Sequence, residues 1–300
     1  MELRAFSPGI YPRSEALVQA TRDLDRGRTT REAVADQAER DLHELVSVQK
    51  AAGLSPLADG MLRWQDLFRP LAEAAEGLDA RPLTRYLDTN TFYRAVLVEG
   101  RPRLREHLPA PGFEEGWLGT LPSPVAFARA AGDAASAQAL AADVLAPQIE
   151  AWAEAGAELI VLSEPFAARE GAVDELAKAL GELSASVPLA LWLPFGDAGP
   201  VLEPLAAAPV AAVGINFYAT SLDAVPEGYP KEILAGVLDA RSSALESPEE
   251  IARLAEALLG RKPVGLSLVP NGDLQFVPEP IAREKLARLG CSRAALAEAA

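Results

Sequence analysis

Residues 187–197 read VPLALWLPFGD, and this stretch decides the fold. The run Val187–Phe195 is apolar, with no alternation of polar residues, which is typical of a strand buried on both faces of a parallel sheet. The chain then enters a loop at Gly196-Asp197. The stretch therefore predicts a central strand of an α/β protein, with Asp197 at the strand's carboxyl end.

Strand-like and helix-like patterns alternate on both sides of this stretch. The other predicted strands are Leu3–Phe6, Pro56–Ala58, Phe92–Val98, Trp117–Leu121, Glu158–Leu162, Val210–Phe217, Ile233–Leu238 and Val264–Val269. The predicted helices include Thr30–Gly53, Ser136–Gly156, Ala172–Leu183 and one with Ser247 as its N-cap. About eight βα units predict a (β/α)8 TIM barrel, an α/β fold with a single core, over residues 1–300. The alternative is an open doubly wound sheet, but no G-x-G-x-x-G follows the first strand.

Composition excludes several classes of function. The formal net charge of −15 argues against binding to nucleic acid or to an anionic membrane surface. The chain has no run of eighteen apolar residues, and its first residues, MELRAFSPG, do not read as a signal peptide. The single cysteine, Cys291, makes a disulfide framework impossible. We therefore expect a cytoplasmic protein that binds a small molecule.

In a barrel of this kind, the functional site lies where the strands end. We expect Ser7, Asp59, Glu164, Asp197 and Asp239 to line one mouth. Each has a structural alternative: Asp-Gly and Pro-Asn-Gly are common turns, and Glu164 before Pro165 can cap a helix. Arg63 and Asp66 can form an ion pair across one helical turn. The remaining candidate ligand-binding residues are Arg13, Arg63, Asp66, Asn90, Tyr93, Arg94, Trp192 and Asn216.

The sequence holds few residues that could bind a transition metal. Its only histidines are His43, within a predicted helix, and His107, in a charged segment. Cys291 is far from both in the sequence. Because catalytic zinc needs His, Cys or carboxylate ligands brought close together, we predict no metal ligands in this chain.

Six ordered motifs carry a resemblance to a known family. They are SPGIYPR at 7–13, ADGMLRWQDLFRPL at 58–71, RYLDTNTFYR at 85–94, AGAELIVLSEP at 155–165, GVLDARSSALESPEEI at 236–251 and VPNGDLQFVP at 269–278. Together they resemble cobalamin-independent methionine synthase, in particular its short single-barrel members and the non-catalytic N-terminal barrel of the long form. The resemblance implies a TIM barrel, a role in methionine biosynthesis, and methyl transfer from 5-methyltetrahydrofolate polyglutamate to a zinc-bound homocysteine thiolate.

The positions that would carry this chemistry differ in the present chain. The family's His-x-Cys zinc ligands match Trp192 and Pro194, its Glu ligand falls near Asn216, and its last Cys ligand matches Gly272. The proton-donating His matches Arg241, and the Asp that holds the homocysteine amine matches Ser163. The resemblance therefore implies the fold, whereas the zinc that the family uses as cofactor lacks its ligands here.

Two classes of function follow. The first is a divergent homocysteine S-methyltransferase-like enzyme that acts without the zinc site, with Glu164, Asp197 and Asp239 as candidate bases and Arg241 as a carboxylate-binding residue. The second is a non-catalytic barrel that binds folate or supports a companion catalytic barrel. The expected ligand is methylfolate polyglutamate or a homocysteine-like thiol. Six arginines between residues 81 and 105 predict a groove for an anionic tail, or else solvated surface charge: Arg81, Arg85, Arg94, Arg101, Arg103 and Arg105.

Overall fold

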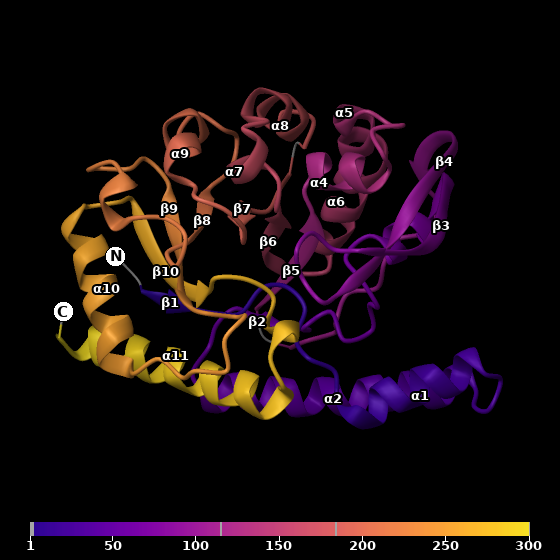
Figure 1. Ribbon diagram of the computed structural model, residues 1–300, viewed down its shortest axis with the longest axis horizontal. Coiled ribbons are helices and arrows are strands. Elements are labelled where there is room, and N and C mark those ends of the chain that lie inside the picture. The colour runs from indigo at the N-terminus through magenta and orange to yellow at the C-terminus, as the bar shows by residue number, and fades with distance from the viewer. Residues whose placement is uncertain (1–2, 115, 184, 300) are drawn as a thin grey trace.

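The computed structural model of the chain is a closed parallel barrel with an added hairpin (Figure 1). It describes residues 3–114, 116–183 and 185–299. Within these ranges, eight parallel strands form one sheet in the order β1-β10-β9-β8-β7-β6-β5-β2. The strands are β1 (Arg4–Ala5), β2 (Leu57–Ala58), β5 (Trp117–Pro122), β6 (Ala157–Ser163), β7 (Leu189–Leu193), β8 (Ala212–Asn216), β9 (Glu232–Leu238) and β10 (Gly265–Pro270).

The two ends of this sheet meet, which closes the barrel. The Ser55 amide, just before β2, donates a hydrogen bond to the Ala5 carbonyl oxygen of β1 (2.9 Å). On its other side, β1 pairs with β10, with Arg4 opposite Ser267. The predicted (β/α)8 class is therefore confirmed, and the open sheet is excluded.

Helices surround the barrel, as the βα alternation predicts (Figure 1). The helices are α1 (Glu15–Asp25), α2 (Arg31–Ala51), α3 (Arg69–Ala74), α4 (Pro124–Ala130), α5 (Ala137–Leu140), α6 (Ala146–Glu154), α7 (Ala167–Glu170), α8 (Val173–Leu180), α9 (Gly199–Leu205), α10 (Pro248–Gly260) and α11 (Glu279–Ala299). Shorter turns of helix are η1 (Ala141–Leu145), η2 (Leu222–Ala224) and η3 (Leu274–Phe276). None of the described helices is long and apolar enough to cross a membrane.

Several predicted helix signals act as expected. Thr30 and Ser136 cap α2 and α5 through their side chains, and Ser247 forms a capping box with Glu250 at the start of α10. The predicted helix Ser136–Gly156 is interrupted, because the π-helical turn η1 separates α5 from α6. In a π-helical turn, each backbone hydrogen bond spans one residue more than in an α-helix, and the spacing of apolar residues in the sequence does not reveal this.

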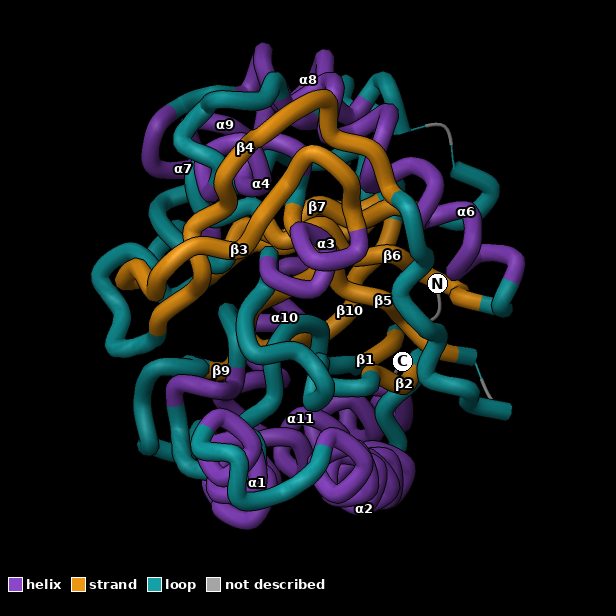
Figure 2. Tube along the Cα trace, turned by 90° about the vertical axis from the view of Figure 1, so that its right-hand side faces the viewer, coloured by secondary structure: helices purple, strands orange, loops and turns teal. Residues whose placement is uncertain are grey.

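One predicted barrel strand lies outside the barrel. Phe92–Val98 belongs to β4 (Phe92–Leu104), which pairs antiparallel with β3 (Ala75–Arg85) in a separate hairpin. This hairpin is inserted between β2 and β5, and Figure 2 shows it, with α3, on one side of the barrel. The prediction of a strand at Phe92–Val98 was right and its place in the barrel was wrong, since an apolar run does not reveal which strand it will pair with.

The barrel interior is filled by side chains from all eight strands or the residues next to them. Its members are Phe6, Ala58, Leu118, Leu159, Val161, Ala190, Trp192, Ala212, Leu234 and Val269. Trp192 is the largest of them and is fully buried. The interior accommodates it because Gly214, on the neighbouring strand β8, has no side chain: a Cβ there would lie 2.5 Å from the indole ring. The barrel is therefore a packed core, and any ligand must bind at its mouth.

Candidate functional site at the barrel mouth

The carboxyl ends of the barrel strands bring the predicted polar residues to one end of the molecule. Ser7 follows β1, Asp59 follows β2, Glu164 follows β6, Asp197 follows β7 and Asp239 follows β9. Because all these strands are parallel, all five residues stand at the same mouth.

An asparagine network connects the carboxyl ends of four strands. The Asn271 side-chain amide, after β10, donates to Asn216 Oδ1 at the end of β8 (3.1 Å), and Asn216 Nδ2 donates to the Pro194 carbonyl oxygen after β7 (3.1 Å). Asn271 Oδ1 also accepts a hydrogen bond from the Ala240 amide after β9 (2.8 Å). Both asparagines are buried. Their amides are therefore used to fix the loops of the mouth.

The loop after β9 is held by an ion pair with a lysine of α11. Lys285 of α11 is fully buried and donates to Glu246 Oε2 (2.7 Å) and to the Ala244 carbonyl oxygen (2.7 Å). The other Glu246 oxygen accepts from the Asp239 amide (2.7 Å) and from the Tyr218 hydroxyl (2.9 Å). Burial opposes the charge on Glu246, but the bonds from Lys285 and its neighbours outweigh burial and lower its pKa.

A hollow of about 430 Å³ opens at the mouth between these loops. Arg241 lies over the Phe195 ring at 4.2 Å, and Arg169 reaches Asp88 of the hairpin turn at 3.6 Å. The hollow is lined by Asp88, Arg169, Phe195, Gly196, Asn216, Tyr218, Ala219, Asp239, Arg241 and Asn271. Its volume lies within the range of about 300 to 1,000 Å³ that small-molecule sites occupy.

Several predicted carboxylates are engaged in holding the backbone. Glu164 is fully buried: its Oε1 accepts from the Phe166 and Ala167 amides (2.7 and 3.0 Å), and its Oε2 accepts from the Ser123 hydroxyl. Asp197 Oδ1 accepts from the Gly199 amide (2.9 Å). The structural alternative for Glu164, a helix cap at α7, is thus what the geometry shows, although its desolvated carboxyl has a raised pKa.

Three more predicted residues tie the hairpin to the barrel. Asp66 Oδ1 accepts from the Phe68 and Arg69 amides (2.9 and 2.8 Å), and Asp66 Oδ2 accepts from the Arg94 amide in β4 (3.0 Å). Tyr93 packs edge-on against Phe68 with ring centroids 5.2 Å apart. These contacts place the turn at residues 86–91 over the mouth.

The other predicted binding residues lie apart from the hollow or are inaccessible. Asn90 is exposed on the hairpin turn, and Arg13 is half-buried in the loop after β1. The helical spacing predicts an ion pair between Arg63 and Asp66, but Arg63 instead pairs with Glu39 of α2. The reason is that residues 59–68 form turns rather than a helix. Trp192 is sealed inside the barrel and cannot contact a ligand from the mouth without a rearrangement.

Two residues at the mouth were not predicted from the sequence. Asp273, after β10, is buried, and its Oδ1 accepts from the Ile10 amide (2.8 Å). Burial raises the pKa of its carboxyl to about 6, although the Ile10 amide opposes that rise. Tyr86, at the start of the hairpin turn, is 6% exposed, and its hydroxyl has no hydrogen-bond partner in the described chain. The sequence offers one signal for each: Asp273 directly follows the Pro-Asn-Gly motif, and Tyr86 starts a polar turn.

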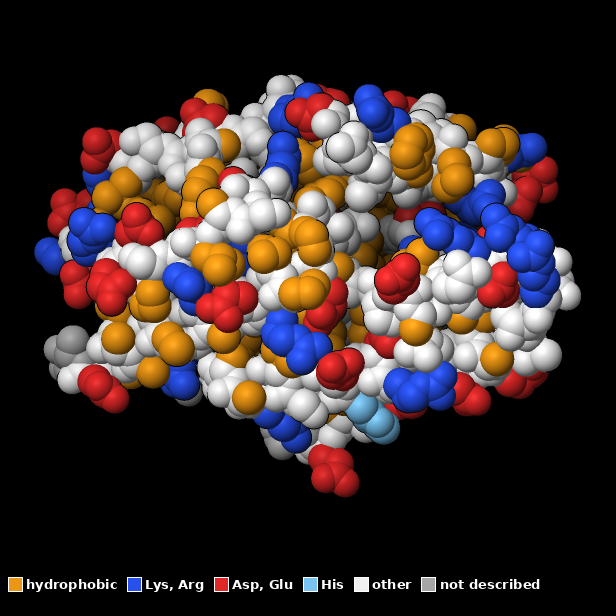
Figure 3. Space-filling view, turned by 60° about the horizontal axis from the view of Figure 1, so that its bottom comes forward, with side chains coloured by type: hydrophobic (Ala, Val, Ile, Leu, Met, Phe, Trp, Pro, Cys, Tyr) orange, Lys and Arg blue, Asp and Glu red, His pale blue; other side chains and the backbone are white. Residues whose placement is uncertain are grey.

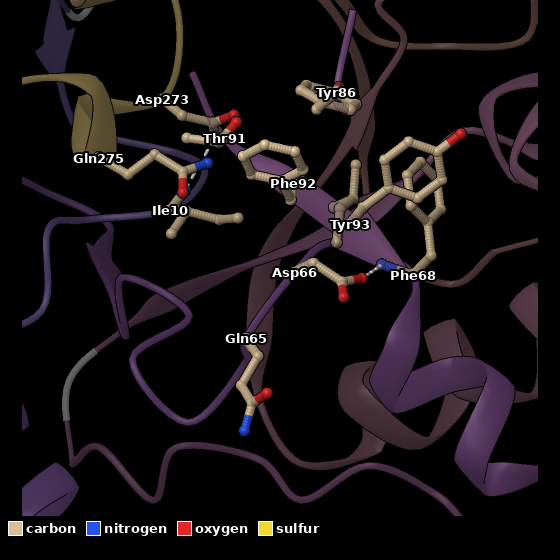
Figure 4. A pocket seen from close by; sticks show the side chains of 11 residues that line it. Ile10, Gln65, Asp66, Phe68, Tyr86, Thr91, Phe92, Tyr93, Asp273 and Gln275 are labelled. Carbon is tan, nitrogen blue, oxygen red and sulfur yellow. Dashed lines mark hydrogen bonds between the residues drawn. The ribbon is translucent and has the colours of Figure 1, made fainter. Parts of the chain in front are cut away.

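Tyr86, Tyr93 and Asp273 line a second, smaller hollow of about 20 Å³ (Figure 4). The Tyr86 ring contacts Tyr93 and Phe195 edge-on, with centroids 5.9 Å away in each case. Since Phe195 lines the larger hollow, Tyr86 stands between the two.

Three of the four positions matched to the family's zinc ligands lie close together. A Cβ built on Gly272 would lie 3.8 Å from Pro194 Cβ, and Asn216 is hydrogen-bonded to the Pro194 carbonyl. Trp192 lies within β7, two residues before Pro194. The residues present do not fit zinc, because an indole, a proline ring and a glycine supply no side-chain metal donor and an amide oxygen is a weak one. Across the described ranges, no group of three or more His, Cys, Asp and Glu side chains could hold a metal ion.

The predicted groove of arginines is a set of separate contacts. Arg81 lies 3.8 Å from Glu99, Arg101 is paired with Asp143 at 3.0 Å, and Arg94 donates to the Arg81 carbonyl (3.3 Å). On the face of the molecule shown in Figure 3, acidic and basic side chains are interspersed over most of the surface, and basic side chains gather toward the right-hand end. For Arg81 and Arg101, the geometry matches the alternative of paired surface charge, whereas Arg94 binds a backbone oxygen.

The fold resembles that of solved methionine-synthase barrels. A B12-independent methionine synthase from Shewanella sp. W3-18-1, solved in complex with selenomethionine, has a TM-score of 0.81 at 15% identity; the match covers 100% of this chain and 99% of that one. A candidate vitamin-B12-independent methionine synthase from Listeria monocytogenes gives 0.72 at 17% identity, with 99% of each chain covered. At these identities, the structures show the shared fold.

The amino-acid sequence is also similar to that of known methyltransferases. The 5-methyltetrahydropteroyltriglutamate–homocysteine methyltransferase of Mycobacterium tuberculosis (strain ATCC 25618 / H37Rv) is 28% identical over 299 residues, covering 79% of this chain and 37% of that protein. The Synechococcus sp. enzyme of the same name is 26% identical over 252 residues, covering 77% and 33%. The chain thus spans about a third of the length of these relatives. No family model matches it. The resemblance to the cobalamin-independent methionine synthases is confirmed.

Proposed function

We propose that this protein is a divergent methionine-synthase-like barrel that binds a small carboxylate-bearing ligand at its mouth and does not use zinc. One observation carries the proposal. Three of the four positions matched to the family's ligands lie together, at Pro194, Asn216 and Gly272, yet Pro194 and Gly272 offer no side-chain donor, and neither does Trp192 at the fourth position.

The mouth supports ligand binding in two ways. Its hollow of about 430 Å³ is large enough for a small molecule, and Arg241 stands there as a planar cation stacked on Phe195. A guanidinium binds a carboxylate through two parallel hydrogen bonds. The selenomethionine in the Shewanella relative supports an amino-acid-like ligand, since that protein covers the same length of chain.

The first experiment measures metal and ligand together. Protein made in zinc-supplemented medium is dialysed, its metal content is determined, and L-methionine is titrated calorimetrically into the wild type and into Arg241→Met. We expect much less than one zinc per chain, binding of methionine to the wild type, and at least tenfold weaker binding to Arg241→Met. About one zinc retained per chain, or no binding of methionine by the wild type, would refute the proposal.

A second candidate function is methyl transfer without zinc, and Asp273 is the observation that favours it. In such a transfer, the methyl group moves from N5 of methyltetrahydrofolate to a thiol sulfur, the thiol loses its proton, and N5 gains one. A buried carboxyl with a pKa of about 6 can give that proton, whereas Arg241 cannot. Formation of methionine from methyltetrahydrofolate and homocysteine by the purified protein, lost in Asp273→Asn, would establish this candidate. No formation above an uncatalysed control would exclude it.

A further inference from the structure

The end of the β3–β4 hairpin exposes a face that is both apolar and basic. In the register of the two strands, Leu83 lies opposite Arg94. Arg85, two residues further along β3, lies opposite Phe92. Residues that are opposite each other or two apart share a face, so these four side chains form one face, here termed the hairpin tip. Tyr93 projects from the other face, where it packs against the aromatic cluster.

The hairpin tip has the properties of a protein–protein contact. Leu83 is 62% exposed and Phe92 is 52% exposed. Arg85 has no hydrogen-bond or ion-pair partner among the described residues. The one carboxylate of the turn, Asp88, is already paired with Arg169. Exposed apolar side chains on a two-stranded edge, rimmed by unpaired charge, mark a surface that another protein covers. A partner that fits this surface is apolar and acidic.

A surface of that kind lies on the same chain, beside α10. A groove of about 530 Å³ opens between the loops after β8 and β9 and the start of α10, and it is here termed the α10 groove. Its exposed apolar residues are Tyr218 and Leu245. Its charged residues are Asp239, Glu246 and Glu250, and no described Lys or Arg lines it. Glu246 is neutralised by its ion pair with α11, whereas Asp239 and Glu250 form no ion pair within the described chain.

The two surfaces are complementary in charge and in apolar character. Of the five large apolar side chains that are exposed in the described chain, two lie on the hairpin tip and two line the α10 groove. The hairpin and α10 stand on opposite sides of the barrel (Figure 1), so a tip does not reach the groove of its own chain. Both surfaces nevertheless belong to the mouth end, because the groove shares Tyr218 and Asp239 with the mouth hollow.

We propose that the protein forms a twofold dimer in which the hairpin tip of each copy docks in the α10 groove of the other. A twofold axis repeats each contact, so tip meets groove twice. The repetition matters because a stable interface buries about 800 Å² per partner, more than the end of one hairpin supplies. The net charge of −15 opposes self-association in general, and the basic tip provides the local attraction that overcomes it. This inference does not depend on the ligand proposed above.

Sedimentation velocity tests the dimer at chain concentrations from about 1 to 100 µM, a range that covers weak specific complexes. About 0.15 M salt screens the repulsion between whole molecules but not the charges in contact. The tip variant carries Leu83→Glu and Arg85→Glu, and the groove variant carries Leu245→Arg. The control variant carries Arg26→Glu and Arg31→Gln, between α1 and α2, and makes the net charge more negative by the same amount as the tip variant.

We expect the mass of the wild type to rise with concentration from 31.7 kDa toward twice that value. The tip and groove variants should each associate at least tenfold more weakly, and the control variant should behave like the wild type. A wild type that stays monomeric throughout overturns the dimer, and a partner of another kind then has to be sought. A mass beyond that of a dimer overturns the twofold arrangement. A control variant that is weakened as much as the tip variant refutes the role of the tip.

A mixture of the tip and groove variants provides the decisive measurement. The tip variant keeps a native groove, and the groove variant keeps a native tip, so a mixed dimer contains one native contact while each variant alone contains none. We expect the equimolar mixture to associate more tightly than either variant alone. A misfolded variant cannot supply its native half, so this gain also shows that both variants fold. Association of the mixture no stronger than that of the separate variants would refute the docking of tip in groove.

Discussion

Gly9, in the loop after β1, is the residue at which substitution should report most directly on the packing of the mouth. It has a φ of +81°, and a Cβ there would lie 2.3 Å from Asp273 Oδ1 and 2.8 Å from the Trp192 ring. Gly9→Ala therefore incurs two costs. A left-handed conformation costs a non-glycine residue about 1 to 2 kcal/mol, and overpacking a core costs about 1 to 3 kcal/mol more. We expect the free energy of unfolding to fall by about 2 to 5 kcal/mol.

A matched control separates the two costs. Gly27, after α1, has a φ of +66°, and a Cβ there would meet no heavy atom of the described chain within 4 Å. Gly27→Ala should therefore lose only the conformational part, about 1 to 2 kcal/mol. The change that alanine makes to the unfolded chain is common to both variants and cancels in the difference.

Urea unfolding followed by tryptophan fluorescence measures both variants against the wild type. The expected difference between Gly9→Ala and Gly27→Ala is about 1 to 3 kcal/mol. Equal losses in the two variants would refute the close contact between Gly9, Trp192 and Asp273, and with it the geometry of the small hollow.

Three further outcomes follow from the buried charges and caps. Between about pH 4 and 6 the folded wild type holds a proton on Asp273 that the unfolded chain releases. As the pH rises through this window, the free energy of unfolding of the wild type should therefore fall by about 2 to 3 kcal/mol relative to that of Asp273→Asn. Equal pH profiles of the two proteins in urea titrations would contradict the raised pKa. Lys285→Ala leaves Glu246 buried without its cation and should lose about 3 to 5 kcal/mol, whereas the double variant with Glu246→Gln should recover part of that loss in the same assay. Ser247→Ala removes the side-chain cap of α10 and should lower the free energy of unfolding by about 0.5 to 2 kcal/mol, and a melting curve identical to the wild type's would show that the capping box contributes nothing.

The barrel was predictable because its strands are buried on both faces. The run Val187–Phe195 is apolar throughout, and Glu158–Leu162 is apolar after its first residue; the spacing of such runs by helices leaves few other folds. Residues 92–98 resemble a barrel strand in sequence, but they pair with β3 in the hairpin. Which strand a segment pairs with depends on contacts between distant parts of the chain. The π-helical turn at Ala141–Leu145 left no sign in the apolar period.

The site was predictable as a place but not in its particulars. Parallel strands fix which end carries the polar residues, so Asn216 and Asp239 fell at the mouth as expected. Whether a carboxylate can contact a ligand depends on the backbone amides beside it, which the sequence does not show. Glu164 accepts a hydrogen bond from the first amide of α7, whereas Asp273 is buried and has a raised pKa. Tyr86 was not predicted from the sequence, because its distinguishing feature is a buried hydroxyl without a hydrogen-bond partner in the described chain. Only the folded structure shows which hydrogen-bond partners a group has.

The pairing of β1 with β10 has a consequence for how the protein is made. Arg4 and Ser267 lie side by side, so this pairing joins two strands that are far apart along the chain. At about 5 to 20 residues per second, the first strand waits roughly 13 to 50 seconds for its neighbour. During that interval its backbone groups on that side are unpaired, and the nascent chain is most open to chaperones and to mispairing.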